Sequence, residues 1–190
     1  MNRDDAWALL KEFTKSESLR KHALAVEAAM RGCAQRRGED VTLWGVVGLL
    51  HDLDYERWPD PKDHTRETAR ILRERQVDEE IVGAIFSHAP WNWEQYPLDT
   101  PLRKALFAVD ELSGFVMAVA YVRPGRLNGM TASSVKKKMK QKSFAAAVNR
   151  DDIRYGAELM ELSLERMIED VISDLSAISD SLGLATASPD

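Results

Sequence analysis

The feature that most constrains the fold of this chain is an apolar segment that ends in a charged pair. Residues 43–50 carry no charge and are followed directly by His51 and Asp52, with another acid at Asp54. A helix that is apolar on all sides is typical of the centre of a globular domain. An imidazole and a carboxylate at the end of such a helix are costly to bury unless another group binds them. The sequence therefore predicts a central helix whose C-terminal end carries a site.

The remaining pattern is also helical. Apolar residues recur every three or four positions, and no segment shows the alternation of a strand. Helix-start signals precede these repeats, namely the capping box Thr14-Lys15-Ser16-Glu17, Asp40 or Thr42, Asp63, Asp78, and Thr100 before Pro101. Stop signals follow them at Gly38, Pro90, Pro124-Gly125 and Gly183. The prediction is an all-α, single-domain bundle of about seven to nine helices.

One domain is expected to span residues 1–183, because no low-complexity linker divides the chain. C-terminal helices are expected at 133–182, the last running unbroken from Asp151 or Asp152 to Leu182. Its apolar stripe fits core packing and also a homodimer contact. Residues 184–190 are expected to form a frayed tail.

Composition narrows the class of partner. The chain has 190 residues, 44% of them hydrophobic and 30% charged, as in soluble globular proteins. A net charge of -5 argues against bulk nucleic-acid binding. The single cysteine, Cys33, and a polar N-terminus fit a cytoplasmic protein. The longest apolar-rich stretch, Ala105 to Val122, is interrupted by two acids and a serine, so no membrane span is expected.

The four histidines fall at informative positions. His22 and His88 lie on inward faces of their predicted helices, His51 ends the central helix, and His64 lies in the first turn of its helix. Asp110 lies in a helix whose other inward positions are apolar. Three imidazoles and a carboxylate therefore point into the predicted core from four helices.

Each of these residues, taken singly, has a structural explanation. A lone inward histidine is more often a satisfied core residue than a ligand, Asp52 could bond a neighbouring helix, and Asp110 could pair with an arginine. One metal site explains the whole set more simply, since a buried carboxylate is normally paired or metal-bound. Imidazole and carboxylate ligands suit iron, manganese, zinc or nickel better than calcium or magnesium alone.

The order of these residues resembles the signature of the HD-domain superfamily of metal-dependent phosphohydrolases. His22, the His51-Asp52 pair and Asp110 follow that signature, and His64 and His88 are similar to the additional histidines of its two-metal branches. The resemblance covers a core of about residues 19–123 and implies an HD-fold bundle. The Gly-Tyr-Pro motif of the cyclic-dinucleotide phosphodiesterase branch is missing, so that substrate is not implied.

The resemblance also implies roles. A first divalent metal ion would be held by His22, His51, Asp52 and Asp110, and Asp52 would bridge to a second ion completed by His64 and His88. Two ions per chain are thus expected, with Fe, Mn, Ni, Zn or Mg as candidates. Metal-activated water would cleave a phosphoester or phosphoanhydride of a small molecule or nucleotide. Two alternatives stay open, an HD-type di-iron oxygenase and a non-catalytic, metal-stabilised module that binds nucleotides.

Further side chains are candidates for the reaction or for substrate binding. Asp54 and Glu56 follow the central pair and could protonate a leaving group or orient water. Candidates for binding phosphate or a base are Arg66, Lys137, Lys140 and Trp91. Solvated surface charges and ordinary loop packing are the alternatives for these residues.

Overall fold

The regular structure of the chain is helical throughout the described part. The computed structural model describes residues 1–186, and these contain no strand. The elements are α1 (Arg3–Phe13), α2 (Glu17–Arg37), α3 (Val41–Leu50), α4 (Arg66–Glu74), α5 (Glu79–Ser87), the 3-10 helix η1 (Pro90–Asn92), α6 (Pro101–Tyr121), α7 (Ala132–Met139), α8 (Arg150–Leu159), α9 (Leu164–Ser176) and α10 (Ser179–Leu182). The predicted all-α fold is confirmed.

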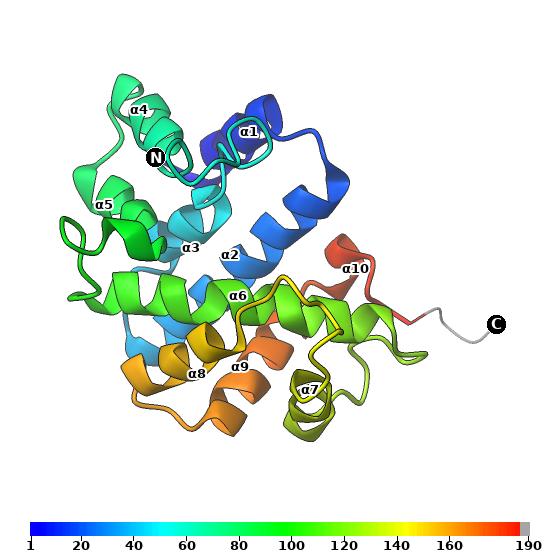
Figure 1. Ribbon diagram of the computed structural model, residues 1–190. Helices are drawn as coiled ribbons and strands as arrows, with labels where there is room; N and C mark the ends of the chain where they lie inside the picture. Colours follow the sequence, from blue (N-terminus) through cyan, green and yellow to red (C-terminus); the bar gives the residue numbers. More distant parts are fainter. Residues whose placement is uncertain (187–190) are drawn as a thin grey trace.

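Helix α6 crosses the middle of the molecule, and the other helices pack around it (Figure 1). In this view α3, α4 and α5 lie above α6, whereas α7, α8 and α9 lie below it. α6 contacts α2, α3 and α5 from the first half of the chain, and α7, α8 and α9 from the second half. It is therefore the element that joins the two halves of the chain into one core.

Helix α3 is the central helix that its apolar sequence predicted. Every residue from Trp44 to Leu50 is buried, and His51 forms the C-cap. The Asp40 side chain accepts hydrogen bonds from the first backbone N–H groups and begins the helix. α3 packs closely on α2, because a Cβ atom at Gly48 would lie 2.8 Å from the carbonyl oxygen of Val26. This contact holds the end of α3 beside the middle of α2.

Two predicted helix starts are wrong. Ser16, rather than Thr14, caps α2, since its hydroxyl accepts the N–H of Leu19. The helix expected from Asp63 begins only at Arg66. Thr65 has a φ of 69°, which helical backbone does not allow, so the chain turns at this residue first. His64 consequently lies in the turn before α4 and not in its first turn.

The unbroken final helix is also wrong, because α8, α9 and α10 replace it. Glu161 has a φ of 58°, and the Ser163 side chain caps α9. The apolar repeat continues across the break because both α8 and α9 pack against α6. Five apolar side chains of α9 are buried in the core, namely Met167, Ile168, Val171, Ile172 and Leu175, which agrees with core packing of this stripe. The homodimer contact stays a prediction.

The C-terminal end is more ordered than predicted as far as it is described. Leu184 is buried, and its N–H donates to the carbonyl of Ser179 at 2.8 Å. The predicted frayed tail is thus wrong at this residue, and residues 187–190 lie outside the described residues. No helix between residues 1 and 186 is long and apolar enough to cross a membrane.

Candidate metal centre

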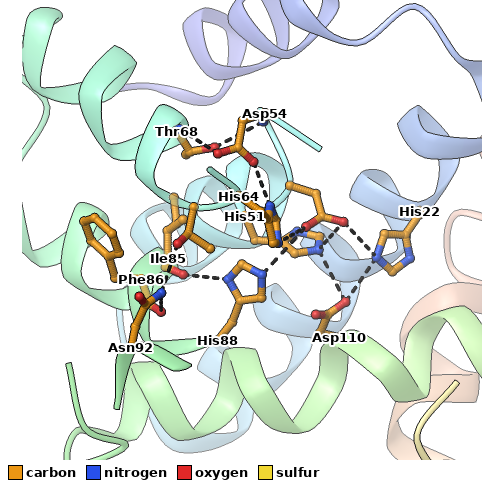
Figure 2. A network of polar contacts seen from close by, with 12 residues as sticks. His22, His51, Asp54, His64, Thr68, Ile85, Phe86, His88, Asn92 and Asp110 are labelled. Atoms are coloured by element: carbon orange, nitrogen blue, oxygen red, sulfur yellow. Dashed lines mark hydrogen bonds and ion pairs between the residues drawn. The ribbon is translucent and has the colours of Figure 1, made fainter. Parts of the chain in front are cut away.

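The predicted ligands converge at the end of α3. His22 comes from α2, His51 from the α3 C-cap, His64 from the turn before α4, and His88 from the α5 C-cap. Figure 2 shows these four imidazoles gathered in one place, with the Asp110 side chain of α6 beside them. The rings of His51 and His88 meet edge to face, with centroids 5.4 Å apart. Residues separated by up to 88 positions in sequence thus share one site.

Asp52 lies between two groups of imidazoles. Its Oδ2 atom is 3.5 Å from His51 Nε2 and 3.9 Å from His22 Nε2. Its Oδ1 atom is 3.5 Å from His64 Nε2 and 3.7 Å from His88 Nε2. Each oxygen and its two imidazole nitrogens form a group with mutual distances within 4.8 Å, as in sites that hold a metal ion. One carboxylate can therefore serve two adjacent ions.

Asp110 joins the first of these groups. Its Oδ1 atom accepts a hydrogen bond from His22 Nε2 at 3.1 Å and is 3.3 Å from His51 Nε2. Burial alone would raise the pKa of Asp110, but the neighbouring His51 and His22 side chains hold it well below its usual value. Asp110 is thus an ionised carboxylate beside His22, His51 and Asp52.

Hydrogen bonds from Nδ1 to backbone carbonyls orient two of the imidazoles. His51 Nδ1 donates to the carbonyl of Gly48 at 2.8 Å, and His88 Nδ1 donates to that of Ile85 at 2.6 Å. Both carbonyls belong to the last turn of a helix, where the regular pattern of backbone hydrogen bonds ends. An imidazole at a helix C-cap can therefore bond backwards and turn its Nε2 atom towards the site. A bond at Nδ1 leaves the Nε2 lone pair free for a metal.

The donor set fits a divalent cation. His51 Nε2 is buried and has no hydrogen-bond partner among the described residues. Burial would lower the pKa of His51, but the carboxylates of Asp52 and Asp110 outweigh it and raise the pKa to about 10. These carboxylates therefore favour positive charge at His51, which either a proton or a metal ion supplies. Burial lowers the pKa of His88. Imidazole and carboxylate ligands around an unpartnered nitrogen suit transition-metal ions.

Comparison with known proteins assigns the family. The model of the HD domain matches residues 19–114, which contain all six candidate ligands. The chain belongs to the HD-domain family. The HD domain of a phosphodiesterase, PgpH, from L. monocytogenes has a similar fold in its crystal structure. The two are 15% identical with a TM-score of 0.54 over 90% of this chain and 98% of that one. No curated protein matches the chain.

A pocket of about 470 Å³ opens over the centre of this HD domain. Its lining consists of the candidate ligands, aromatic and apolar side chains, and acids: Leu19, His22, Asp52, Tyr55, His64, His88, Ala89, Pro90, Trp91, Phe107, Asp110, Glu111, Gly114, Val148 and Asp152. Trp91 lies here as expected, with its ring centroid 6.1 Å from that of His64. No lysine or arginine is among these lining residues.

Several residues of this pocket were not predicted from the sequence. Phe107 and Gly114 lie three residues before and four after Asp110, so helical periodicity places them on the same face of α6. That spacing was a usable signal. The position of Asp152 had no such signal in the sequence, because Asp152 reaches the pocket only through the packing of α8 against α6.

Glu111 also lines this pocket. Burial and the neighbouring Asp110 raise the pKa of Glu111 to about 7.

Asp54 is a positioning residue, which corrects the catalytic role expected for it. Its side chain is fully buried. Its Oδ1 atom accepts from His64 Nδ1 at 2.8 Å, and its Oδ2 atom accepts the backbone N–H of Thr68 at 2.8 Å. Figure 2 shows Asp54 bonded between these two residues. Since both oxygens are engaged, Asp54 orients His64 rather than contacting a substrate.

Four other predicted residues lie away from the pocket of the HD domain. Glu56 is exposed, and its carboxylate accepts the N–H groups of Lys15 and Ser16 at the start of α2. Arg66 lines a separate groove on α4. Lys137 and Lys140 are exposed on and just after α7, and neither lines the pocket. The structure therefore does not bring Glu56 or the three cations to this pocket, and it gives no support to the roles expected of them.

Proposed function

We propose that this chain is a metal-dependent phosphohydrolase with a two-metal centre. Its substrate is a phosphoester or phosphoanhydride of a small molecule or nucleotide. Membership of the HD-domain family and the fold shared with a phosphodiesterase HD domain support this activity at the level of the family. The acidic, lysine-free pocket argues for a small substrate over a nucleic-acid polymer, since a polymer requires a basic surface.

The placement of Asp52 is the observation that carries the proposal. Its two oxygens face different pairs of imidazoles, His22 with His51 and His64 with His88. The paired arrangement is that of a ligand bridging two adjacent cations, as phosphatases with two metal ions require.

The residues of the chain then have separate tasks. Bound divalent ions would activate a water molecule and neutralise charge on the phosphoryl group. His22, His51 and Asp110 would hold one ion, whereas His64 and His88 would hold the other. Tyr55 and Trp91 flank His64 at the pocket and limit how a substrate approaches it, because their rings are in contact distance of the imidazole.

Hydrolysis of a model ester tests the proposal. Protein reconstituted separately with Mn²⁺, Fe²⁺, Ni²⁺, Zn²⁺ or Mg²⁺ is assayed for p-nitrophenol release from p-nitrophenyl phosphate and bis(p-nitrophenyl) phosphate. We expect metal-dependent release that Asp52→Ala abolishes and that Glu56→Gln, a distant and exposed change, preserves. Metal-loaded protein that hydrolyses neither ester would contradict the proposal.

Oxygen consumption and nucleotide binding, measured on the same metal-loaded protein, distinguish the two alternatives. Oxygen consumption by the Fe²⁺-loaded protein, without ester hydrolysis, would instead identify a di-iron oxygenase that uses the same ligands. Metal-bound protein that binds nucleotides but turns over neither ester nor oxygen would identify a regulatory module.

A further inference from the structure

One wall of the pocket carries two carboxylates that the metal centre does not use. Glu111 of α6 and Asp152 of α8 both line the pocket, opposite no lysine or arginine. Among residues 1–186 neither of them forms an ion pair, although the neighbouring Asp151 pairs with Arg154 at 2.7 Å. The only charged groups that share the pocket with them are the histidines and acids of the candidate centre.

The packing of α6 on α8 brings these carboxylates to one place. A Cβ atom at Gly156 would lie 2.7 Å from the Cα of Ala108, so the helices touch there. The rings of Phe107 and Tyr155 also meet, with centroids 5.9 Å apart. Glu111 lies one turn further along α6 from Ala108, whereas Asp152 lies one turn back along α8 from Gly156. Since α6 and α8 run in opposite directions (Figure 1), both lie on the same side of this contact, and both line the pocket.

The pocket is a ligand site on independent grounds. His51 Nε2 is fully buried and has no hydrogen-bond partner among the described residues, although it lies 3.3 Å from an oxygen of Asp110 and 3.5 Å from one of Asp52, and both acids line the pocket. That nitrogen points to a cation at the candidate centre and hence to an anionic group beside it. A phosphoryl group bound there would have Glu111 and Asp152 as its neighbours on the α6–α8 wall.

We propose that Glu111 and Asp152 form a subsite for a positively charged amine carried by the phosphorylated substrate. The inference rests on the proposed function, because it assumes that the phosphoryl group binds at the metal centre. Two unpaired carboxylates repel a second anion, and a cationic amine satisfies both of them with charge-assisted hydrogen bonds. Phe107, four residues before Glu111 on the same helical face, adds an aromatic ring on which such a cation is stabilised.

The substrate class is accordingly a small zwitterion with a phosphoryl group at one end and an amine at the other. The volume of about 470 Å³ suits a small molecule. A neutral or purely anionic phosphoester would leave both carboxylates unpaired beside the bound anion. Selectivity for an amine-bearing substrate therefore comes from Glu111 and Asp152 and does not depend on the chemistry at the metal centre.

Binding of matched phosphonates tests the subsite without turnover. The C–P bond of a phosphonate is not a phosphoester, so 3-aminopropylphosphonate and propylphosphonate report affinity alone. Isothermal titration of Mn²⁺-loaded protein at mildly alkaline pH should show about ten-fold tighter binding of the amine, the worth of one charged hydrogen bond. The double variant Glu111→Gln/Asp152→Asn should bind both compounds equally. Asp151→Asn removes a charge from the neighbouring, largely exposed position and should keep the preference.

Each result has one meaning. Equal affinities in the wild-type protein, a preference that survives in the double variant, or no binding of either compound would overturn the subsite. Hydrolysis of p-nitrophenyl phosphate, measured on the same preparation, decides the proposed function separately. Ester hydrolysis without amine preference would leave that function standing and refute only the subsite.

Discussion

At the scale of the residue, the site depends on how each imidazole is held as much as on which residues are present. His51 and His88 are oriented by backbone carbonyls of their own helices. His64 lies in a turn and has no such carbonyl. The carboxylate of Asp54 accepts the hydrogen bond from its Nδ1 atom instead. A carboxylate that accepts from a ligating histidine also raises the basicity of that ligand. The half of the centre at His64 therefore depends on one buried side chain.

Asp54→Asn should weaken metal binding at the half of the centre that contains His64 and His88. The amide has the same shape but cannot accept at both positions, so it no longer holds the His64 tautomer. Losses on removing such a partner are about 10- to 100-fold in metal affinity. Mn²⁺ titration should show one binding step weakened by that factor and the other retained.

Circular dichroism shows whether the Asp54→Asn protein is folded. Thr68→Ser is the control variant, because it changes the neighbouring side chain that contacts Asp54. Serine keeps the hydroxyl and the N–H that Asp54 contacts, so both binding steps should be unchanged. Unaltered affinity at both steps in folded Asp54→Asn protein would refute the positioning role.

The sequence predicted which residues gather at the centre, but not all of their roles. Helix faces and helix ends follow from spacing, so His22, His51 and His88 were placed correctly. The role of Asp54 was missed because it depends on Thr68, which approaches from another helix through tertiary packing. Lys137 and Lys140 were misplaced for a related reason, since a run of charge does not specify what it faces.

At the scale of the element, close approach between helices sets the geometry of the site. α3 carries His51 and Asp52, and it reaches α2 closely enough only because Gly48 has no side chain. Helix-capping signals at Asp40, Asp78 and Gly38 located the helices well. The break between α8 and α9 was missed because their apolar repeat is continuous across it, and the positive φ of Glu161 has no sequence signal.

Gly48→Ala should destabilise the fold although alanine favours helix. The added Cβ atom would lie 2.8 Å from the backbone oxygen of Val26, which cannot move away without shifting α2. Overpacking of this kind costs about 1–3 kcal/mol in the free energy of unfolding. Urea denaturation measures it.

Gly114→Ala is the matched change for Gly48→Ala. Its Cβ atom would meet nothing closer than His22, at 3.7 Å, so we expect stability to be unchanged or to rise by up to about 1 kcal/mol. Equal effects of the two alanines would show that the α2–α3 contact does not limit the fold.

Ser163→Ala should test the break in the C-terminal helices. The Ser163 hydroxyl accepts the N–H of Arg166 at 3.1 Å and begins α9. Loss of such a cap costs about 1 kcal/mol in stability. Thermal unfolding should show the loss, whereas Ser133→Ala at an exposed position of α7 should leave the melting temperature unchanged. A continuous helix through residues 160–163 would make Ser163→Ala neutral or stabilising.

At the scale of the whole molecule, positive charge and the pocket are separated. The basic side chains of α7 lie outside the pocket, and Lys136 is already paired with Glu165 at 3.1 Å. Within the described residues, positive charge at the pocket comes only from the imidazoles of the candidate centre, so any further positive charge must come from bound metal or from the substrate. This separation follows from the packing of the helices, which composition alone does not reveal.

The charge reversal Lys137→Glu/Lys140→Glu should accordingly change the KM for p-nitrophenyl phosphate by less than about two-fold at physiological salt, where surface charges are screened. Steady-state kinetics at low and physiological salt measures the effect. A large rise in KM at both salt concentrations would show that these lysines contact the substrate, which would contradict this prediction.

Metal content tests the central claim most directly. Elemental analysis of protein reconstituted with manganese, iron, nickel or zinc should give about two ions per chain, as a bridging carboxylate implies. Asp52→Ala protein that remains folded by circular dichroism should lose most of both ions, because Asp52 contacts both groups of imidazoles. Wild-type protein that takes up none of these metals, or Asp52→Ala protein that keeps two ions, would contradict the account.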